Sequence, residues 1–148
     1  MAWRSTHQDN FPTLDDAAQG AITNLAINYG GEKLMIKRFA GTTPTRSRAV
    51  TYGGIVYAVA TAKNKAAPLY EQTRDALAQI DSTLADAGSD KSRILRATIY
   101  ITDMSRKPDM DRAWNEWVDR ANPPQRACIG ATLADTDLVE ILVTAAQQ

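Results

Sequence analysis

Apolar and polar positions follow regular periods from residue 35 onward, and these periods predict most of the elements. Short alternating or wholly apolar runs predict strands at 35–39, 94–102, 126–133 and 138–146, and a hairpin at 48–62 around Gly53-Gly54. Apolar residues at helical spacing predict helices at 68–89 and 108–120. Pro68 suits the first helical turn and Gly88 is placed to end that helix.

The faces of the strands indicate how these elements pack. In the strand at 94–102, alternation places Leu95 with Ala97, Ile99 and Ile101 on one face. Two helices against one sheet give a two-layer α+β domain, in which the helices cover one face. The last strand is apolar on both of its faces, so the other face of the sheet needs a cover as well. We therefore expect a homo-oligomer.

Residues 1–34 differ from the rest and are expected to form an N-terminal extension. Thr13 is a plausible N-cap, a narrow apolar stripe runs from Leu14 to Leu25, and Gly30-Gly31 would stop the helix. Gly20 lies in the middle of this stretch and weakens it as a helix. A helix that docks on a neighbour and a mobile arm both remain open. The main domain is expected to span 35–148.

Composition narrows the class of protein. The 148 residues fit one domain, and 17 basic against 17 acidic residues argue against nucleic-acid binding through bulk charge. The single cysteine cannot form an internal disulfide and suits a reducing compartment. The polar start MAWRSTHQDN lacks the core of a secretory signal, and no apolar run approaches membrane-spanning length. We expect a soluble cytoplasmic protein with no membrane partner.

Several kinds of catalytic chemistry have no support in the sequence. The only histidine is His7, so a histidine-based triad or a zinc site is not expected. No phosphate-binding loop, dinucleotide fingerprint or nucleophile elbow occurs. We therefore expect neither a cofactor nor a metal. Cys128 has no base nearby in sequence, which favours a packing role over a nucleophilic one.

Two charged residues stand inside runs that otherwise indicate buried strands. The stretch PPQRACIGATLADTDLVEI places Arg126 and Glu140 there, and Cys128 shares a strand face with Arg126. Because ions are costly to bury alone, each needs a partner. The two strands flank the turn at 134–137, so Glu140 could lie on or beside an adjacent strand. One interpretation is an ion pair that links subunits; the other is a guanidinium that binds a substrate carboxylate while Glu140 handles a water or a proton.

The same stretch resembles the C-terminal signature of the Rid family, also called YjgF/YER057c/UK114. The similarity covers about 35–146 and includes MIKR, YGGIVYAV, EQTRDALAQIDSTLADAGSDKSRILRATIYITDM and AWNEWV, nearest to the YoaB-like bacterial branch. It implies a chorismate-mutase-like α+β fold that assembles as a homotrimer with clefts at the subunit interfaces. It also implies a cofactor-independent deaminase, a hydrolase that converts 2-aminoacrylate-type enamines and 2-imino acids to 2-oxo acids and ammonia.

The resemblance also assigns residues. Arg126 matches the arginine that binds the substrate carboxylate, Glu140 the acidic residue associated with the water, and Cys128 a residue of the cleft wall. An imine carbon is already electrophilic, so holding the substrate beside a positioned water removes much of the barrier. Protonating the departing nitrogen needs nothing beyond water or backbone donors.

Some positions depart from the family pattern. Arg46, followed by Ser47, stands where a tyrosine is usual; it could bind a second carboxylate, as in an aminomuconate-like substrate, or point into solvent. The segment between Arg126 and Glu140 is one residue short. Asp111 stands where a neutral amide is common, and it is interpreted as a solvated helix residue.

Three functions compete. The first is a general enamine and imine deaminase. The second is a non-catalytic module that binds small carboxylates or another protein; a nucleic-acid version is disfavoured because the chain has no basic stripe. The third is a pathway-specific aminohydrolase of a larger enamine, whose cleft residues 1–34 would remodel.

Overall fold

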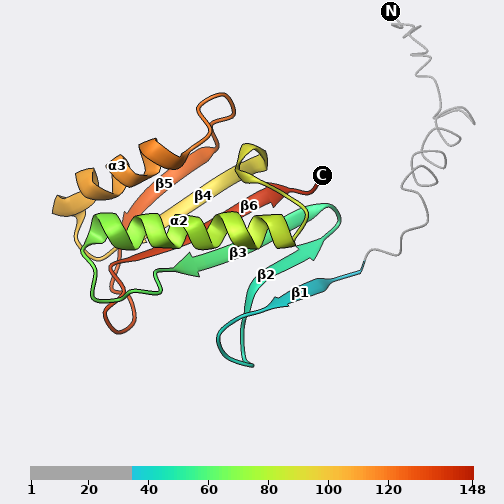
Figure 1. Ribbon diagram of the computed structural model, residues 1–148, viewed down its shortest axis with the longest axis horizontal. Coiled ribbons are helices and arrows are strands. Elements are labelled where there is room, and N and C mark those ends of the chain that lie inside the picture. The colour runs from blue at the N-terminus through green and yellow to red at the C-terminus, as the bar shows by residue number, and fades with distance from the viewer. Residues whose placement is uncertain (1–34) are drawn as a thin grey trace, which may run out of the picture. The chain divides into compact units, whose positions relative to one another are not determined.

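The computed structural model describes residues 35–148, and the helix expected within 1–34 lies outside the described residues. The strands are β1 (Lys37–Ala40), β2 (Ser47–Tyr52), β3 (Ile55–Thr61), β4 (Ile94–Ile101), β5 (Gln125–Gly130) and β6 (Val139–Ala146). The helices are α2 (Leu69–Asp86) and α3 (Lys107–Trp117). Two short 3-10 helices are also present: η1 (Lys91–Arg93) directly precedes β4, and η2 (Met104–Arg106) directly precedes α3. The predicted order of strands and helices is confirmed (Figure 1).

Glycine and proline bound these elements as their backbone preferences require. Gly53 and Gly54 both have positive φ angles, 58° and 77°, in the two-residue turn between β2 and β3. Such angles are typical of the tight turns that suit the twist of a hairpin. Pro68 is the N-cap residue of α2, and Gly88, with φ of 74°, follows the C-cap residue Ala87.

The six strands form one mixed sheet in the order β1-β2-β3-β6-β4-β5. All neighbouring pairs are antiparallel except β4 and β5, which run parallel and are joined through α3. Of the two placements expected for Glu140, on or beside a strand adjacent to that of Arg126, the structure shows the second: β4 lies next to β5, and Glu140 is on β6 beyond it. Strand existence follows from local pattern, whereas lateral order depends on pairing between distant segments.

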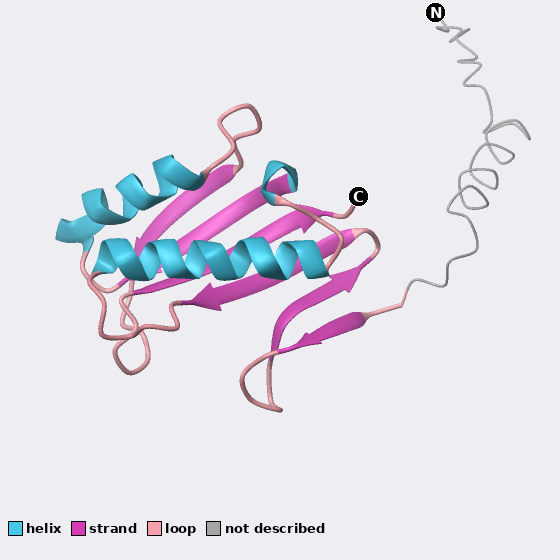
Figure 2. Ribbon diagram, viewed as in Figure 1, coloured by secondary structure: helices cyan, strands magenta, loops and turns pink. Residues whose placement is uncertain are grey.

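Both helices pack on the same face of this sheet (Figure 2). Alternate residues of the central strands point under them and are fully buried, among them Ile99, Ile141 and Val139. Leu77, Ile80 and Leu84 of α2 and Met110 of α3 complete the core. The predicted two-layer arrangement, with two helices on one face of a mixed sheet, is therefore confirmed.

Leu95 does not share the buried face with Ala97, Ile99 and Ile101, and that prediction is wrong. Its side chain is 52% exposed, whereas Ile94 is buried. The register between β4 and β6 shifts between Ile94 and Arg96, which marks a bulge. A bulge inserts one residue into a strand and reverses the alternation of faces on its far side.

The face of the sheet away from the helices carries large apolar side chains. Tyr57 of β3, Ile129 of β5 and Leu142 of β6 are 53%, 42% and 40% exposed. Their neighbours on this face include Val59 and Thr98, which pair with Leu142 from the flanking strands. Several large exposed apolar side chains on one face are typical of a protein contact.

Candidate active site

Arg126 and Cys128 lie on the helix-covered face of the edge strand β5. They pair with Ala97 and Ile99 of β4, which are both fully buried beneath the helices, and directly paired residues share a face. The Arg126 side chain keeps 26% of its surface exposed because β5 has no strand on its outer side. The structure thus brings Arg126 and Cys128 together, with the arginine side chain partly open to solvent.

Asp111 of α3 lies directly against Arg126. Its Oδ1 atom is 2.9 Å from Nη1 of the arginine, and its Oδ2 atom accepts a hydrogen bond of 2.5 Å from Nζ of Lys107. Both atoms of the first contact are sealed from solvent and are not aligned as a hydrogen bond, so charge holds this contact. The guanidinium also lies 5.5 Å from the ring centre of Trp114. Asp111 is therefore the counter-ion of Arg126 within this chain.

This finding corrects the interpretation of Asp111 as a solvated helix residue. Its side chain is only 28% exposed. Burial raises the pKa of Asp111, but the hydrogen bond from Lys107 and the positive charge of Arg126 outweigh burial, so its pKa lies below the ordinary value. The signal in the sequence was the four-residue spacing of Lys107 and Asp111, which places both on one side of a helix.

The surroundings of Cys128 do not activate its thiol. Burial raises its pKa, the charge of Asp111 adds to this rise, and the charges of Lys107 and Arg126 oppose it without cancelling it. A raised pKa leaves less thiolate at neutral pH than a free cysteine has. This chemistry fits a residue of the cleft wall.

We expect iodoacetamide to alkylate Cys128 more slowly at pH 7 than it alkylates a free cysteine, and Cys128→Ala to keep its fold. Because the pKa is raised, the rate should reach half of its maximum at a pH above that of a model thiol. Mass spectrometry of the alkylated protein across a pH series measures this. The assignment would be contradicted if the alkylation rate of Cys128 reached half of its maximum at or below the pH at which the rate for glutathione does.

Glu140 lies on the other face of the sheet from Arg126. It pairs with Tyr100 of β4 and Thr61 of β3, whereas its neighbours Val139 and Ile141 point into the core. Along β4, its partner Tyr100 is three residues beyond Ala97, the partner of Arg126, which is a distance of about 10 Å. A single chain therefore does not bring Arg126 and Glu140 together.

A second ionic cluster borders the position of Glu140. Lys65 forms an ion pair with Asp137 and donates a hydrogen bond of 2.8 Å to Oγ1 of Thr61, the residue paired with Glu140. The Asp137 side chain is only 14% exposed. This cluster fixes the loop that leads into β6.

Arg46 and Ser47 lie at the opposite edge of the sheet from Arg126. Arg46 is exposed and its Nη2 atom donates a hydrogen bond of 3.3 Å to Oγ1 of Thr42, inside the loop between β1 and β2. The loop closes tightly, because a Cβ at Gly41 would come within 2.7 Å of the Arg46 carbonyl oxygen. With β3, β6 and β4 in between, these residues can join Arg126 only across two copies of the chain.

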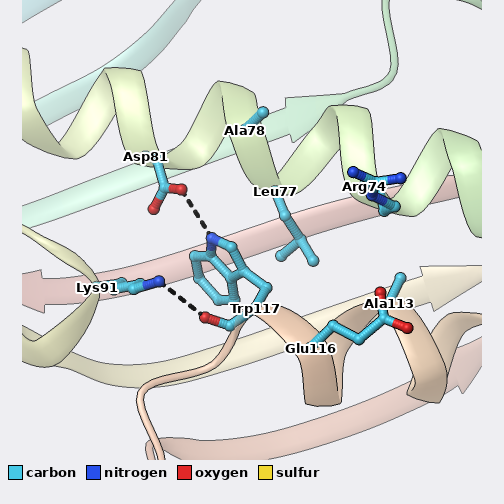
Figure 3. Close-up of a pocket in the computed structure, with 8 residues that line it drawn as sticks. All are labelled: Arg74, Leu77, Ala78, Asp81, Lys91, Ala113, Glu116 and Trp117. Atoms are coloured by element: carbon cyan, nitrogen blue, oxygen red, sulfur yellow. Dashed lines mark hydrogen bonds between the residues drawn. The ribbon is translucent and has the colours of Figure 1, made fainter.

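Two surface hollows of the described domain lie away from Arg126. One, lined by Arg46 and its loop, belongs to the β1–β2 edge. The other lies between the helices, where Trp117 donates a hydrogen bond of 2.8 Å to Asp81 and its carbonyl accepts one of 3.0 Å from Lys91 (Figure 3). The hollow between the helices is lined by side chains of both charges, and these hydrogen bonds already use several of its polar groups. Arg126 is not among its lining residues.

Two further observations concern the part of the chain that the structure describes. None of its helices combines the length and the apolar composition needed to cross a membrane. Its His, Cys, Asp and Glu side chains form no cluster of three or more that could hold a metal ion.

The fold and the edge arginine together define a small α+β protein with a partly exposed, ion-paired arginine on an edge strand. Residues 36–147 match the family described as endoribonuclease L-PSP. A RutC family protein of Haemophilus ducreyi is 46% identical over 104 residues, which are 68% of this chain and 87% of that protein. The RutC family protein YoaB of Escherichia coli is 38% identical over 101 residues, covering 68% and 89% of the two chains.

A similar solved structure belongs to the same group of proteins as the sequence relatives. NMB1025 of Neisseria meningitidis, a member of the YjgF protein family, is 41% identical, has a TM-score of 0.73 and covers 78% of this chain and 97% of its own. This chain belongs to the YjgF/Rid family, and YoaB is among its relatives, as the sequence motifs predicted.

Proposed function

We propose that this protein is a deaminase that hydrolyses 2-imino acids and 2-aminoacrylate-type enamines to 2-oxo acids and ammonia. The observation that carries the proposal is Arg126 on an edge strand, with 26% of its side chain exposed and its guanidinium beside Trp114 and Asp111. A guanidinium fork of this kind suits a carboxylate. Membership of the YjgF/Rid family supports the same role at the level of the family.

The proposal includes a homotrimer of the chorismate-mutase-like class. The exposed Tyr57, Ile129 and Leu142 on the open sheet face supply an apolar surface that a second copy would cover. The two sheet edges carry different candidate residues, Arg126 at one and Arg46 at the other. A cleft between copies would therefore combine groups that one chain keeps apart.

The chemistry requires few groups. A protonated 2-imino acid binds through its carboxylate to Arg126, and the oxygen of a water adds to the C2 carbon. One proton of the water passes to the nitrogen, and the C–N bond then breaks as the remaining hydroxyl of the adduct becomes the C2 carbonyl. The proton of that hydroxyl joins the departing ammonia, so a 2-oxo acid and an ammonium ion leave. Glu140 orients the water, and because it lies on the other sheet face it would do so from a neighbouring copy.

One observation favours a second candidate, a non-catalytic module that binds small carboxylates. Asp111 already neutralises Arg126 in part, and Glu140 is remote from Arg126 in the same chain. Such a site could hold a ligand without turning it over.

The decisive assay generates a 2-imino acid in situ with an amino-acid oxidase and follows ammonia release with and without the purified protein. The deaminase proposal expects a clear acceleration, and calorimetry with 2-oxobutyrate is expected to show binding. Binding without acceleration would replace the proposal with the non-catalytic module. Neither binding nor acceleration would exclude both.

A further inference from the structure

The side chains around Arg126 form a patch of alternating charge. Lys107, Asp111 and Arg126 follow one another, joined by contacts of 2.5 Å and 2.9 Å. Two positive charges and one negative charge leave a net charge of +1. Each of the three side chains is about one-quarter to one-third exposed, at 34%, 28% and 26%, so a ligand can reach all of them.

Asp111 has room for a further donor. An ionised carboxylate offers about four lone-pair positions. Lys107 takes one on Oδ2 and Arg126 contacts Oδ1. Oδ1 is sealed from solvent, whereas the side chain as a whole keeps 28% of its surface exposed. A ligand bound to Arg126 would thus have a negatively charged oxygen beside it.

We propose that Asp111 makes this site selective for zwitterions, ligands with a protonated nitrogen next to a carboxylate, over ligands that carry negative charge alone. The inference rests on the proposed function, in which Arg126 binds the ligand carboxylate. The carboxylate of a 2-iminium acid then binds the guanidinium, and the N–H groups of the ligand's iminium nitrogen donate hydrogen bonds to Asp111. Asp111 is a specificity-determining residue in this account, because it recognises the charge of the nitrogen.

The same arrangement disfavours a dicarboxylate. A second ligand carboxylate near Arg126 would meet the negative charge of Asp111, and like charges in a partly buried site repel. A monocarboxylic iminium acid fits the patch better than an aminomuconate-like ligand.

The test compares two stable ligands by calorimetry, 2-oxobutyrate as the anion and L-2-aminobutyrate as the zwitterion. For Asp111→Asn, the ratio of the affinity for the zwitterion to the affinity for the anion is expected to fall about tenfold or more, since one charged hydrogen bond is worth at least that factor. The anion should bind more tightly than to wild type and the zwitterion more weakly. A role confined to stability would weaken both ligands together.

Asp109→Asn is the matched control, because Asp109 lies on the same helix, loses the same charge and pairs with Arg106 instead. It should leave the ratio unchanged. Should Asp111→Asn fail to fold, Lys107→Met provides the opposite test: the patch loses its net positive charge, and binding of the anion should weaken more than that of the zwitterion.

The inference is overturned if folded Asp111→Asn leaves the ratio of zwitterion affinity to anion affinity unchanged. The same holds for Lys107→Met where Asp111→Asn does not fold. If wild type still accelerates imine hydrolysis in that case, the proposed function stands without it. If wild type binds neither ligand and turns over no imine, the proposed function fails and the inference fails with it.

Discussion

Arg126→Ala is expected to lower kcat/KM for imine hydrolysis by about a hundredfold or more, because losing one partner of a desolvated charge pair costs about 2–5 kcal/mol. The guanidinium offers a planar fork that suits a carboxylate, and alanine offers neither charge nor donor. Arg126→Lys keeps the charge but loses the fork, so an intermediate rate is expected. Ammonia release at several substrate concentrations measures both variants.

The fold should survive this change. Asp111 keeps its hydrogen bond from Lys107, so removing Arg126 does not leave that carboxylate alone. Arg112→Ala is the matched control: Arg112 follows Asp111 on α3, but its guanidinium lies 3.8 Å from the ring centre of Tyr70, toward α2. The control should keep wild-type kinetics. Equal activity of folded Arg126→Ala and wild type would remove Arg126 from the site.

Gln72→Leu is expected to destabilise the protein by about 2–4 kcal/mol, because it leaves several buried backbone groups without a partner. The Gln72 side chain is fully buried in the first turn of α2. Its Nε2 atom donates to the carbonyls of Lys65 and Ala67 at 3.0 Å each and to that of Thr136 at 3.3 Å. Its Oε1 atom accepts from the Leu138 amide at 3.0 Å.

These bonds join the start of α2 and the loop before it to the loop before β6, and Leu138 directly precedes the strand that carries Glu140. Urea unfolding followed by circular dichroism gives the change in the free energy of unfolding. Gln79→Leu on the same helix is the control, since Gln79 bonds only Asp75 within its own helix, and it should change stability by less than about 0.5 kcal/mol. Similar losses in both variants would mean that the buried network contributes little.

Local pattern was enough to predict the strands and the two α-helices and some of their ends, whereas α3 ends at Trp117 and not near 120, and β5 ends at Gly130 and not at 133. The Gly53-Gly54 turn, the start of α2 after Pro68 and its end before Gly88 all follow from backbone preferences of those residues. The bulge at Leu95 could not be predicted from the local pattern, because Ile94 and Leu95 are equally apolar and either could begin the alternation of buried residues. Pairing with β6 decides between them.

The site was predictable in part. The charge of Arg126 within a strand marked it as unusual, and its shared face with Cys128 follows from period two. The placement of Glu140 did not follow, because strand order and facing depend on which distant strands pair. Asp111 was missed as the partner of Arg126 because the contact joins α3 to β5, and no local spacing encodes it.

Mixed trimers test the central claim most directly, namely that Arg126 and Glu140 act in one cleft from different copies. Arg126→Ala and Glu140→Gln chains with different tags are co-expressed, and assemblies that carry both tags are purified and assayed for imine hydrolysis. Each variant alone is expected to be nearly inactive, whereas every trimer that carries both tags should restore about one of its three clefts, the one that pairs an intact arginine with an intact glutamate. A mixture no more active than the separate variants would contradict the shared cleft.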